Sequence, residues 1–204
     1  MRTRHEDGGD LPYLVWQFDA PITVASTAGC GGGVGVRRWV INAQVGHDYA
    51  RHDLDQHGAE LAALQGLTGA GVVMLTAANV RGVQHASRGG VAVSATVGLT
   101  HPTWAADDAD VPVAATPPGT INLVAVLPVR LCEAALLNAL TTVTEAKVQA
   151  LLVAGVAGTG TPSDAVTVCC PAEGPAEPFG GPRSPWGAPL ARAAYETVLA
   201  GARR

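Results

Sequence analysis

Short apolar runs separated by glycine and proline dominate the first 130 residues, and they constrain the fold more than any other feature. The Val-rich segments 71–78 (GVVMLTAA) and 89–100 (GGVAVSATVGLT) are bounded by glycine, which is typical of strands. Further strand-like runs span 13–18, 22–27, 36–45, 120–129 and 165–170. Because these runs outnumber the helical segments and cluster before residue 130, we predict an α+β fold with one large mixed or antiparallel sheet covered by a few helices.

Three segments have helical character. The first, 58–67, places three leucines close to one helix face, and 131–156 is the longest apolar segment of the chain. The third, 190–204, is amphipathic and ends in arginines, which suits the helix dipole. We expect a single domain over 1–204, with 1–12 and 171–189 irregular and a long surface loop over 101–118.

Composition narrows the class of protein. The 204 residues are 48% hydrophobic and 15% charged, which is typical of a globular chain with a buried core. A net charge of −4 without a basic stripe argues against a nucleic-acid partner. No apolar run reaches the roughly 18 residues of a membrane span, and the acidic, glycine-rich start does not resemble a signal peptide. Cys30, Cys132, Cys169 and Cys170 form no C-x-x-C pair, so we expect a reduced, cytoplasmic protein.

Lys147 is the only lysine among the 13 basic residues, and it lies inside the apolar segment 131–156. On an ideal helix it falls among leucines and nearly opposite Glu145, so these two side chains cannot meet on the helix surface. Lysine is almost never fully buried without a partner. Two interpretations stay open. Lys147 pairs with a carboxylate inside the domain, or its stem packs on the leucines while its ammonium reaches the surface.

Six motifs occur in a fixed order along most of the chain. They are STAGCGGGVGVRRWVINAQV (from residue 26), VVMLTAA (72), VSATVGLTHP (93), PPGTINLVAVLPVRL (117), ALTTVTEAKVQALLVAGV (139) and GTGTPSDAVTV (158). Together they resemble the adenosylcobinamide amidohydrolase family of corrinoid salvage, over roughly residues 20–170. The resemblance implies hydrolysis of the amide that joins the corrin propionate to aminopropanol in adenosylcobinamide, which gives adenosylcobyric acid.

The resemblance also implies a corrinoid small-molecule substrate, no cofactor, and no nucleic-acid or membrane partner. A homo-oligomer is compatible with the sequence. Two alternatives stay open: a non-catalytic corrinoid-binding protein on the same fold, and a hydrolase of a different small amide. His101 and Pro162 depart from the pattern that we expect for the family.

Amide hydrolysis requires an activated nucleophile or water, together with donors aimed at the developing oxyanion. We predict Glu145 as the general base, with Lys147 either polarising the carbonyl or pairing with Asp164. Because Glu145 and Lys147 point to different sides of an ideal helix, both serve one site only if the helix breaks near Thr144. Cys30 beside the glycine triplet is the best thiol candidate, but a small apolar turn residue is the better interpretation.

The substrate-binding candidates come from glycine- and threonine-containing motifs. They are Gly31, Gly32, Gly33, Asn42, Gly119, Thr120, Asn122, Thr159 and Thr161. Glycines let a flat ligand approach the backbone closely, and threonines can bind an oxyanion or the corrin amides. The glycine loop lacks the G-K-[ST] ending of a phosphate-binding loop.

The segment HDYARHDLDQH (47–57) is the remaining polar cluster. His47, His52 and His57 are spaced five residues apart, so they do not share one face of a helix or a strand. Zinc motifs on helices use a spacing of four instead. We therefore predict a solvated polar loop and no metal site.

Overall fold

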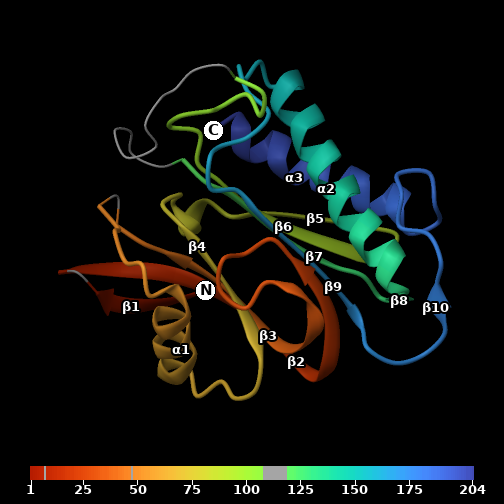
Figure 1. The fold of residues 1–204 in the computed structure, drawn as a ribbon. Helices are drawn as coiled ribbons and strands as arrows, with labels where there is room; N and C mark the ends of the chain where they lie inside the picture. The colour runs from red at the N-terminus through yellow and green to blue at the C-terminus, as the bar shows by residue number, and fades with distance from the viewer. Residues whose placement is uncertain (7, 47, 108–118) are drawn as a thin grey trace.

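An eight-stranded mixed sheet with three α-helices forms the fold, which confirms the α+β prediction (Figure 1). The computed structural model describes residues 1–6, 8–46, 48–107 and 119–204. The strand order is β4-β3-β2-β9-β7-β6-β5, and β1 pairs with β2. These strands are β1 (Arg2–Glu6), β2 (Gly9–Ser26), β3 (Gly33–Gln44), β4 (Gly71–Thr76), β5 (Gln84–Arg88), β6 (Val91–Val97), β7 (Ile121–Val126) and β9 (Ala165–Pro171).

The other elements are α1 (Leu54–Leu64), the 3-10 helix η1 (Val80–Gly82), β8 (Arg130–Leu131), α2 (Glu133–Val153), β10 (Ala176–Glu177) and α3 (Gly187–Ala202). Strands β8 and β10 form a small parallel pair of their own. Within the part of the chain that the structure describes, none of the helices has the length and apolar character needed to cross a membrane.

Strand β2 is 18 residues long and belongs to two parts of the sheet. It pairs with β3 along most of its length, with a shift of register between Gln17 and Ile22. Its first half also pairs with β1, and its second half pairs with β9. One part of the sheet therefore contains β1, β3 and β4, the other contains β9, β7, β6 and β5, and β2 joins them.

The sheet curls so that its two parts face each other. The Thr167 hydroxyl of β9 donates to Met74 Sδ of β4 at 3.2 Å, although β4 and β9 are not neighbours in the sheet. A buried cluster lies between the two parts. Its members are Ile22, Val24, Ala28, Val40, Val72, Met74, Val124, Ala165 and Cys169. Because successive side chains of a strand point to opposite faces, the other face of each part remains free for helices.

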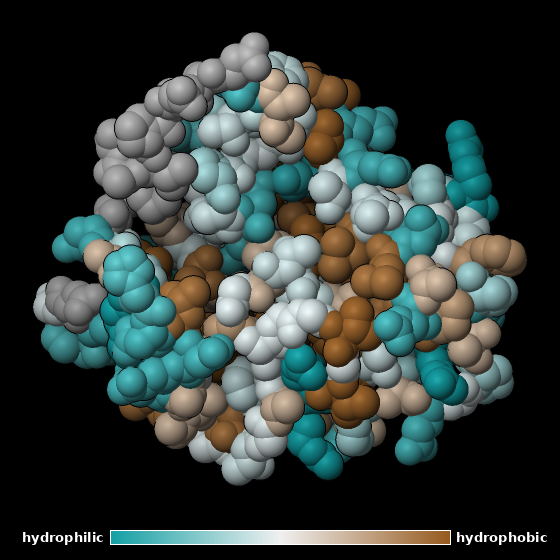
Figure 2. Space-filling view, viewed as in Figure 1, coloured by the Kyte–Doolittle hydropathy of each residue, from teal (hydrophilic) through white to brown (hydrophobic). Residues whose placement is uncertain are grey.

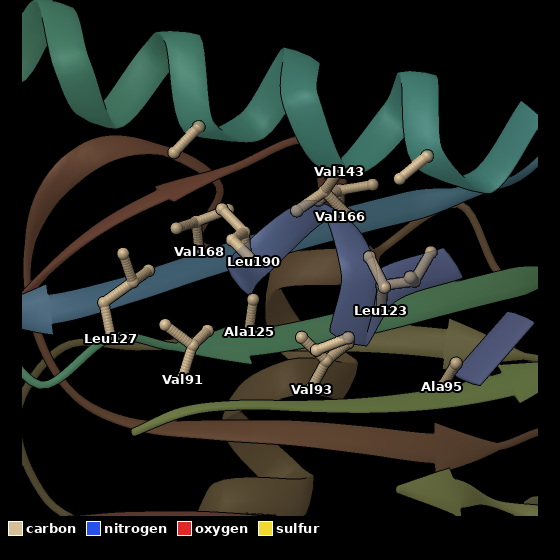
Figure 3. Close-up of a cluster of buried hydrophobic side chains, with 14 of the residues drawn as sticks. Val91, Val93, Ala95, Leu123, Ala125, Leu127, Val143, Val166, Val168 and Leu190 are labelled. Carbon is tan, nitrogen blue, oxygen red and sulfur yellow. The ribbon is translucent and has the colours of Figure 1, made fainter. Parts of the chain in front are cut away.

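Helices α2 and α3 cover the outer face of the β9-β7-β6-β5 part. Figure 3 shows Val91, Val93 and Ala95 of β6 and Leu123 and Ala125 of β7 directed toward these helices. Helix α1 lies at the opposite side of the molecule in Figure 1, where its buried residues pack against the outer face of β3 and β4. Figure 2 shows hydrophilic side chains gathered over α1 and the N-terminal strands.

The prediction that residues 1–12 are irregular is wrong. Residues 2–6 form β1, which pairs with β2 in a hairpin whose last aligned pair is Glu6 and Gly9. Gly8 in the turn has a φ of +74°, a conformation that glycine adopts without strain. The polar strand RTRHE has no apolar alternation, so the hydrophobic pattern could not reveal it. The Asp-Gly dipeptide at 7–8 is a typical hairpin-turn sequence and is the local signal for it.

Other elements differ from the prediction in their bounds. The predicted runs 13–18 and 22–27 belong to one strand, β2, which ends at Ser26. Pro21 lies in the stretch where the register shifts, since proline cannot donate a ladder hydrogen bond. The polar edge strand β5 was not predicted. Segment 171–189 is mostly irregular but contains β10 and the start of α3. Of the predicted loop 101–118, residues 101–107 are irregular, and 108–118 lie outside the described residues.

Candidate active site

A cavity of about 430 Å³ lies where β4 ends and where the segments after β2, after β3 and before β9 meet. Its polar lining consists of Thr27, Cys30, Tyr49, Thr76, Thr120, Ser163 and Asp164. Among the described lining residues Asp164 is the one carboxylate, and none is a lysine or an arginine. The volume is within the roughly 300–1,000 Å³ of small-molecule sites. Apolar side chains such as Val45, Leu54 and Met74 line the rest, so the cavity suits an uncharged group with both polar and apolar atoms.

Lys147 and Asp164 form a buried ion pair beside this cavity. Lys147 is 6% exposed, and its Nζ lies 2.5 Å from Asp164 Oδ2. The interpretation that the lysine pairs inside the domain is thus confirmed, and its alternative, an ammonium at the surface, is wrong. Gly160 makes room for the pair, because a Cβ at this position would lie 2.3 Å from Asp164 Oδ2 and 2.5 Å from Lys147 Nζ.

The Asp164 carboxylate accepts hydrogen bonds from four donors. Its Oδ1 accepts from the Ile121 backbone N–H at 2.8 Å and from the Thr161 hydroxyl at 2.5 Å. Its Oδ2 accepts from the Thr161 backbone N–H at 3.1 Å as well as from Lys147. These contacts fasten the loop before β9 to the start of β7. The pair therefore holds one wall of the cavity in place.

Glu145 does not join this pair. It is exposed on the outer side of α2, where it lines a surface hollow with Val148 and Leu152. Helix α2 is continuous through Thr144, so no break turns Glu145 toward Lys147. The predicted arrangement of Glu145, Lys147 and Asp164 in one site is therefore not formed. The ideal-helix argument, which put the two α2 residues on different sides, agrees with the structure.

Of the predicted substrate-binding residues, Thr120 lines the cavity, and its Oγ1 lies 2.8 Å from Ser163 Oγ. Gly119 precedes it, and its carbonyl accepts from the Ser163 hydroxyl at 3.1 Å. Thr161 is bound to Asp164, while Thr159 fastens a neighbouring loop by accepting from the Ala105 backbone N–H at 2.9 Å. Thr159 and Thr161 therefore stabilise the loops beside the cavity.

Asn42 and Asn122 lie deeper, between the two parts of the sheet. The Asn122 amide donates to Asn42 Oδ1 at 2.9 Å, and the Asn42 amide donates to Thr96 Oγ1 at 3.0 Å. Both asparagines are at most 2% exposed and are not among the residues that line the cavity. They form a polar layer inside the curled sheet.

The glycine triplet Gly31–Gly33 also lies outside the cavity lining, which uses residues 27–30 of the same motif instead. Gly31 has a φ of +70°, and a Cβ there would lie 2.1 Å from the Gly71 carbonyl oxygen. The Arg37 guanidinium donates to the carbonyls of Gly31 and Gly32. The triplet thus makes a tight turn packed on β4.

Sequence reasoning missed a chain of polar contacts that ends at the cavity. The Tyr49 hydroxyl lies 2.8 Å from His57 Nδ1, and His57 Nε2 lies 3.0 Å from Glu6 Oε1. Arg4 Nε donates to Glu6 Oε2 at 2.5 Å. The solvated-loop prediction for 47–57 is wrong at its end, because α1 begins at Leu54 and buries His57 to 1% exposure.

The other two histidines of that segment do not join the chain of contacts. His52 is exposed, and His47 lies outside the described residues. Across residues 1–6, 8–46, 48–107 and 119–204, no three His, Cys, Asp or Glu side chains come together as a metal site would require. No local motif marks Tyr49, His57 and Glu6, because they come from a loop, a helix and a strand that meet only in the fold.

Burial sets the protonation of the groups around the cavity. It lowers the pKa of His57 below the usual 6.5, although nearby Glu6 opposes this shift, so the imidazole is neutral at neutral pH. Burial raises the pKa of the Tyr49 phenol, which stays protonated. Burial and the Asp55 carboxylate raise the pKa of the Cys30 thiol, so a reactive thiolate is not favoured there.

The fold and the cavity define a class: an α+β protein with a small cavity whose described lining combines apolar side chains, hydroxyls and one fully engaged carboxylate. The sequence model of the adenosylcobinamide amidohydrolase family matches residues 2–204, and the chain belongs to this family. It is 40% identical over 132 residues to an adenosylcobinamide amidohydrolase of Halobacterium salinarum, a match that covers 63% of this chain and 57% of that protein. It is 29% identical over 186 residues to an adenosylcobinamide amidohydrolase of Methanosarcina mazei, covering 87% of this chain and 88% of the relative. The chain thus spans little more than half the length of the first relative.

Proposed function

We propose that this chain hydrolyses the amide between the corrin propionate and aminopropanol of adenosylcobinamide, releasing adenosylcobyric acid and 1-amino-2-propanol. The cavity carries this proposal, in a chain that belongs to the family. Its described lining offers hydroxyls for a neutral amide and no basic side chain for an anionic one. We also infer a place in corrinoid salvage in the cytoplasm, in keeping with a chain whose four cysteines are all free.

The size of the cavity limits what can enter it. A corrin ring with its amide arms is larger than the drug-sized ligands that occupy sites of about 300–1,000 Å³. We infer that the aminopropanol arm enters the cavity of about 430 Å³ while the ring rests on its rim. The hydroxyl oxygens of Thr27, Thr120 and Ser163 can accept from the amide N–H. Because Ser163 donates to the Gly119 carbonyl and Thr120 is bonded to Ser163, Thr27 is the hydroxyl of the three whose proton can be donated to the amide carbonyl. The Lys147–Asp164 pair fixes the wall that carries Thr120 and Ser163.

The direct test incubates the purified chain with adenosylcobinamide, with and without a chelator, and follows adenosylcobyric acid by mass spectrometry. Heat-denatured protein serves as the blank. Product in both samples supports a hydrolase that needs no removable metal, and product lost on chelation assigns a metal to the reaction. If no product forms while the corrinoid co-elutes with the protein from a sizing column, the non-catalytic corrinoid-binding protein is correct. Turnover of other small amides in its place favours the different hydrolase.

A further inference from the structure

The contacts of Tyr49, His57 and Glu6 connect the cavity to the N-terminal strand. Tyr49 lines the cavity from the loop after β3, His57 lies in the first turn of α1, and Glu6 ends β1. A hydroxyl, an imidazole and a carboxylate in series are the groups that activate oxygen nucleophiles in many hydrolases. In this protein, Tyr49 carries the hydroxyl and is the residue of the three that lines the cavity.

We propose that Tyr49 is the proton-transfer group of the cavity, and that His57 and Glu6 position it and hold its proton during the reaction. This inference rests on the proposed function, because amide hydrolysis supplies the reaction that needs such a group. The proposal assigns the general-base role to Tyr49 with His57 and Glu6. Glu145 lies on the outer side of α2 and has no part in it.

The carboxylate beside His57 favours one tautomer of the imidazole. His57 Nε2 lies 3.0 Å from Glu6 Oε1 without the geometry of a hydrogen bond, and the negative charge of Glu6 favours the tautomer that carries its proton on Nε2. Nδ1 is then an acceptor, and the Tyr49 hydroxyl donates to it at 2.8 Å. The Tyr49 oxygen keeps lone pairs for a molecule in the cavity, and a water bound there can donate to it.

Hydrolysis then proceeds with all atoms accounted for. As a water oxygen forms its bond to the carbonyl carbon, one water proton passes to the Tyr49 oxygen and the tyrosine proton passes to His57 Nδ1. Glu6 stabilises the imidazolium that forms. When the carbon–nitrogen bond breaks, the leaving nitrogen takes a proton from Tyr49, and His57 returns its proton to Tyr49. The products are a carboxylic acid and an amine, and both side chains are restored.

The carboxylate end of the chain of contacts is fixed by Arg4. This side chain is 7% exposed, bonds Glu6 Oε2 at 2.5 Å and donates to the Gln44 carbonyl at 2.8 Å. The charged groups around His57 are Glu6 and Arg4 on β1, Arg51 and Asp53 before α1, and Glu60 on α1. Arg51 is itself held by Asp53 and Glu60, at 2.7 Å from each.

The first test replaces Tyr49 by Phe, which removes one oxygen and keeps the ring. We expect kcat on adenosylcobinamide to fall by about 100-fold or more with KM little changed, because general acid–base groups contribute roughly 10²–10⁴-fold. Tyr195→Phe, a partly buried tyrosine of α3, is the matched control and should stay at the wild-type rate. A Tyr49→Phe variant within about threefold of wild type overturns the proposal.

The second test separates proton transfer from a purely structural tie between α1 and β1. A surface hollow of about 290 Å³ lies beside His57, lined by Arg4, Glu6 and Glu60 among others, so added imidazole can reach the space left by His57→Ala. We expect imidazole to restore turnover, more strongly as pH rises and the neutral form increases. If folded His57→Ala is not rescued, the proposal fails. If this variant does not fold, His57→Gln takes its place, and turnover retained without a titratable group there overturns the proposal.

The third test is the pH profile. Because the reacting His57 must be neutral, wild-type kcat should fall as pH drops through its pKa, which burial holds below 6.5. Glu6→Gln removes a charge that raises this pKa, so the acidic limb of the kcat profile should move to lower pH. An unmoved limb contradicts the assignment.

Absence of wild-type turnover refutes the proposed function and this proposal together. Wild-type turnover with an unaffected Tyr49→Phe refutes this proposal alone.

Discussion

Two sets of polar contacts beside the cavity differ in how completely their hydrogen bonds are satisfied. In the Lys147–Asp164 pair, the carboxylate already has four donors, all from the protein. In the Tyr49–His57–Glu6 chain of contacts, one end is fixed by Arg4 and the other ends in a hydroxyl on the cavity. The comparison teaches that a buried charge by itself does not mark a reactive site. The group with an unused bonding direction toward the cavity is the better candidate.

The largest effect that tests this comparison is expected for Lys147→Met. The substitution keeps most of the volume but leaves Asp164 as a buried carboxylate without its cation, so the free energy of unfolding should fall by about 3 kcal/mol or more. Turnover per folded molecule should fall far less than in Tyr49→Phe, because Lys147 acts only through the cavity wall that carries Thr120 and Ser163. Chemical denaturation and the assay on the same samples measure both quantities.

A double-mutant cycle sharpens this prediction. Asp164→Asn alone should also destabilise the fold, and the Lys147→Met/Asp164→Asn variant should lose less than the sum of the two single changes. The opposite result, with kcat collapsing while stability holds, would assign Lys147 to the chemistry instead.

Gly160→Ala disturbs the same pair without removing a charge. The added Cβ would lie 2.3 Å from Asp164 Oδ2, so the carboxylate must move, and we expect a loss of about 1–3 kcal/mol by thermal or chemical unfolding. Gly82→Ala is the control, because the nearest atom to its Cβ is 3.9 Å away. Equal stability of the two variants would show that the pair tolerates crowding.

A smaller effect is expected from pH, and it tests the other group. Because the pKa of His57 is lower in the folded state than the usual 6.5, the unfolded chain binds the proton first as the pH falls. The free energy of unfolding should therefore decrease from about pH 6.5 down to the folded pKa and then level off. His57→Gln should remove this part of the slope, while His52→Gln, at an exposed position, should keep it.

The smallest effect is expected at Glu145. Its carboxylate is exposed on the outer side of α2, so Glu145→Gln should change stability by no more than about 0.5 kcal/mol. Turnover should also stay near wild type, in contrast to Glu6→Gln. A large loss of kcat in Glu145→Gln with stability unchanged would restore the original sequence-based hypothesis.

The sequence predicted most of the apolar elements, because alternation and glycine boundaries are local signals. The strands rich in Val and the long helix around Lys147 are in their predicted places. The cost of burying a lone ammonium predicted a carboxylate partner only if Lys147 lay inside the domain, and the sequence left a surface ammonium open until the structure placed Asp164 beside it. The polar elements were missed. Glu6 lies in a strand without apolar residues, and its contact with His57 depends on the packing of α1 on the sheet. No local pattern encodes a contact of that kind.

The shared strand β2 also bears on how the molecule unfolds. Its hydrogen bonds join β1 and β3 on one part of the sheet to β9 on the other, so neither part can separate while β2 stays paired. We therefore expect a single cooperative transition, with the amide protons in the paired stretch of β2 at 22–26, between β3 and β9, exchanging only through global opening. Segments between strands, such as the loop that carries Tyr49, are then free to open locally on a faster timescale. Native-state hydrogen exchange would separate the two regimes residue by residue.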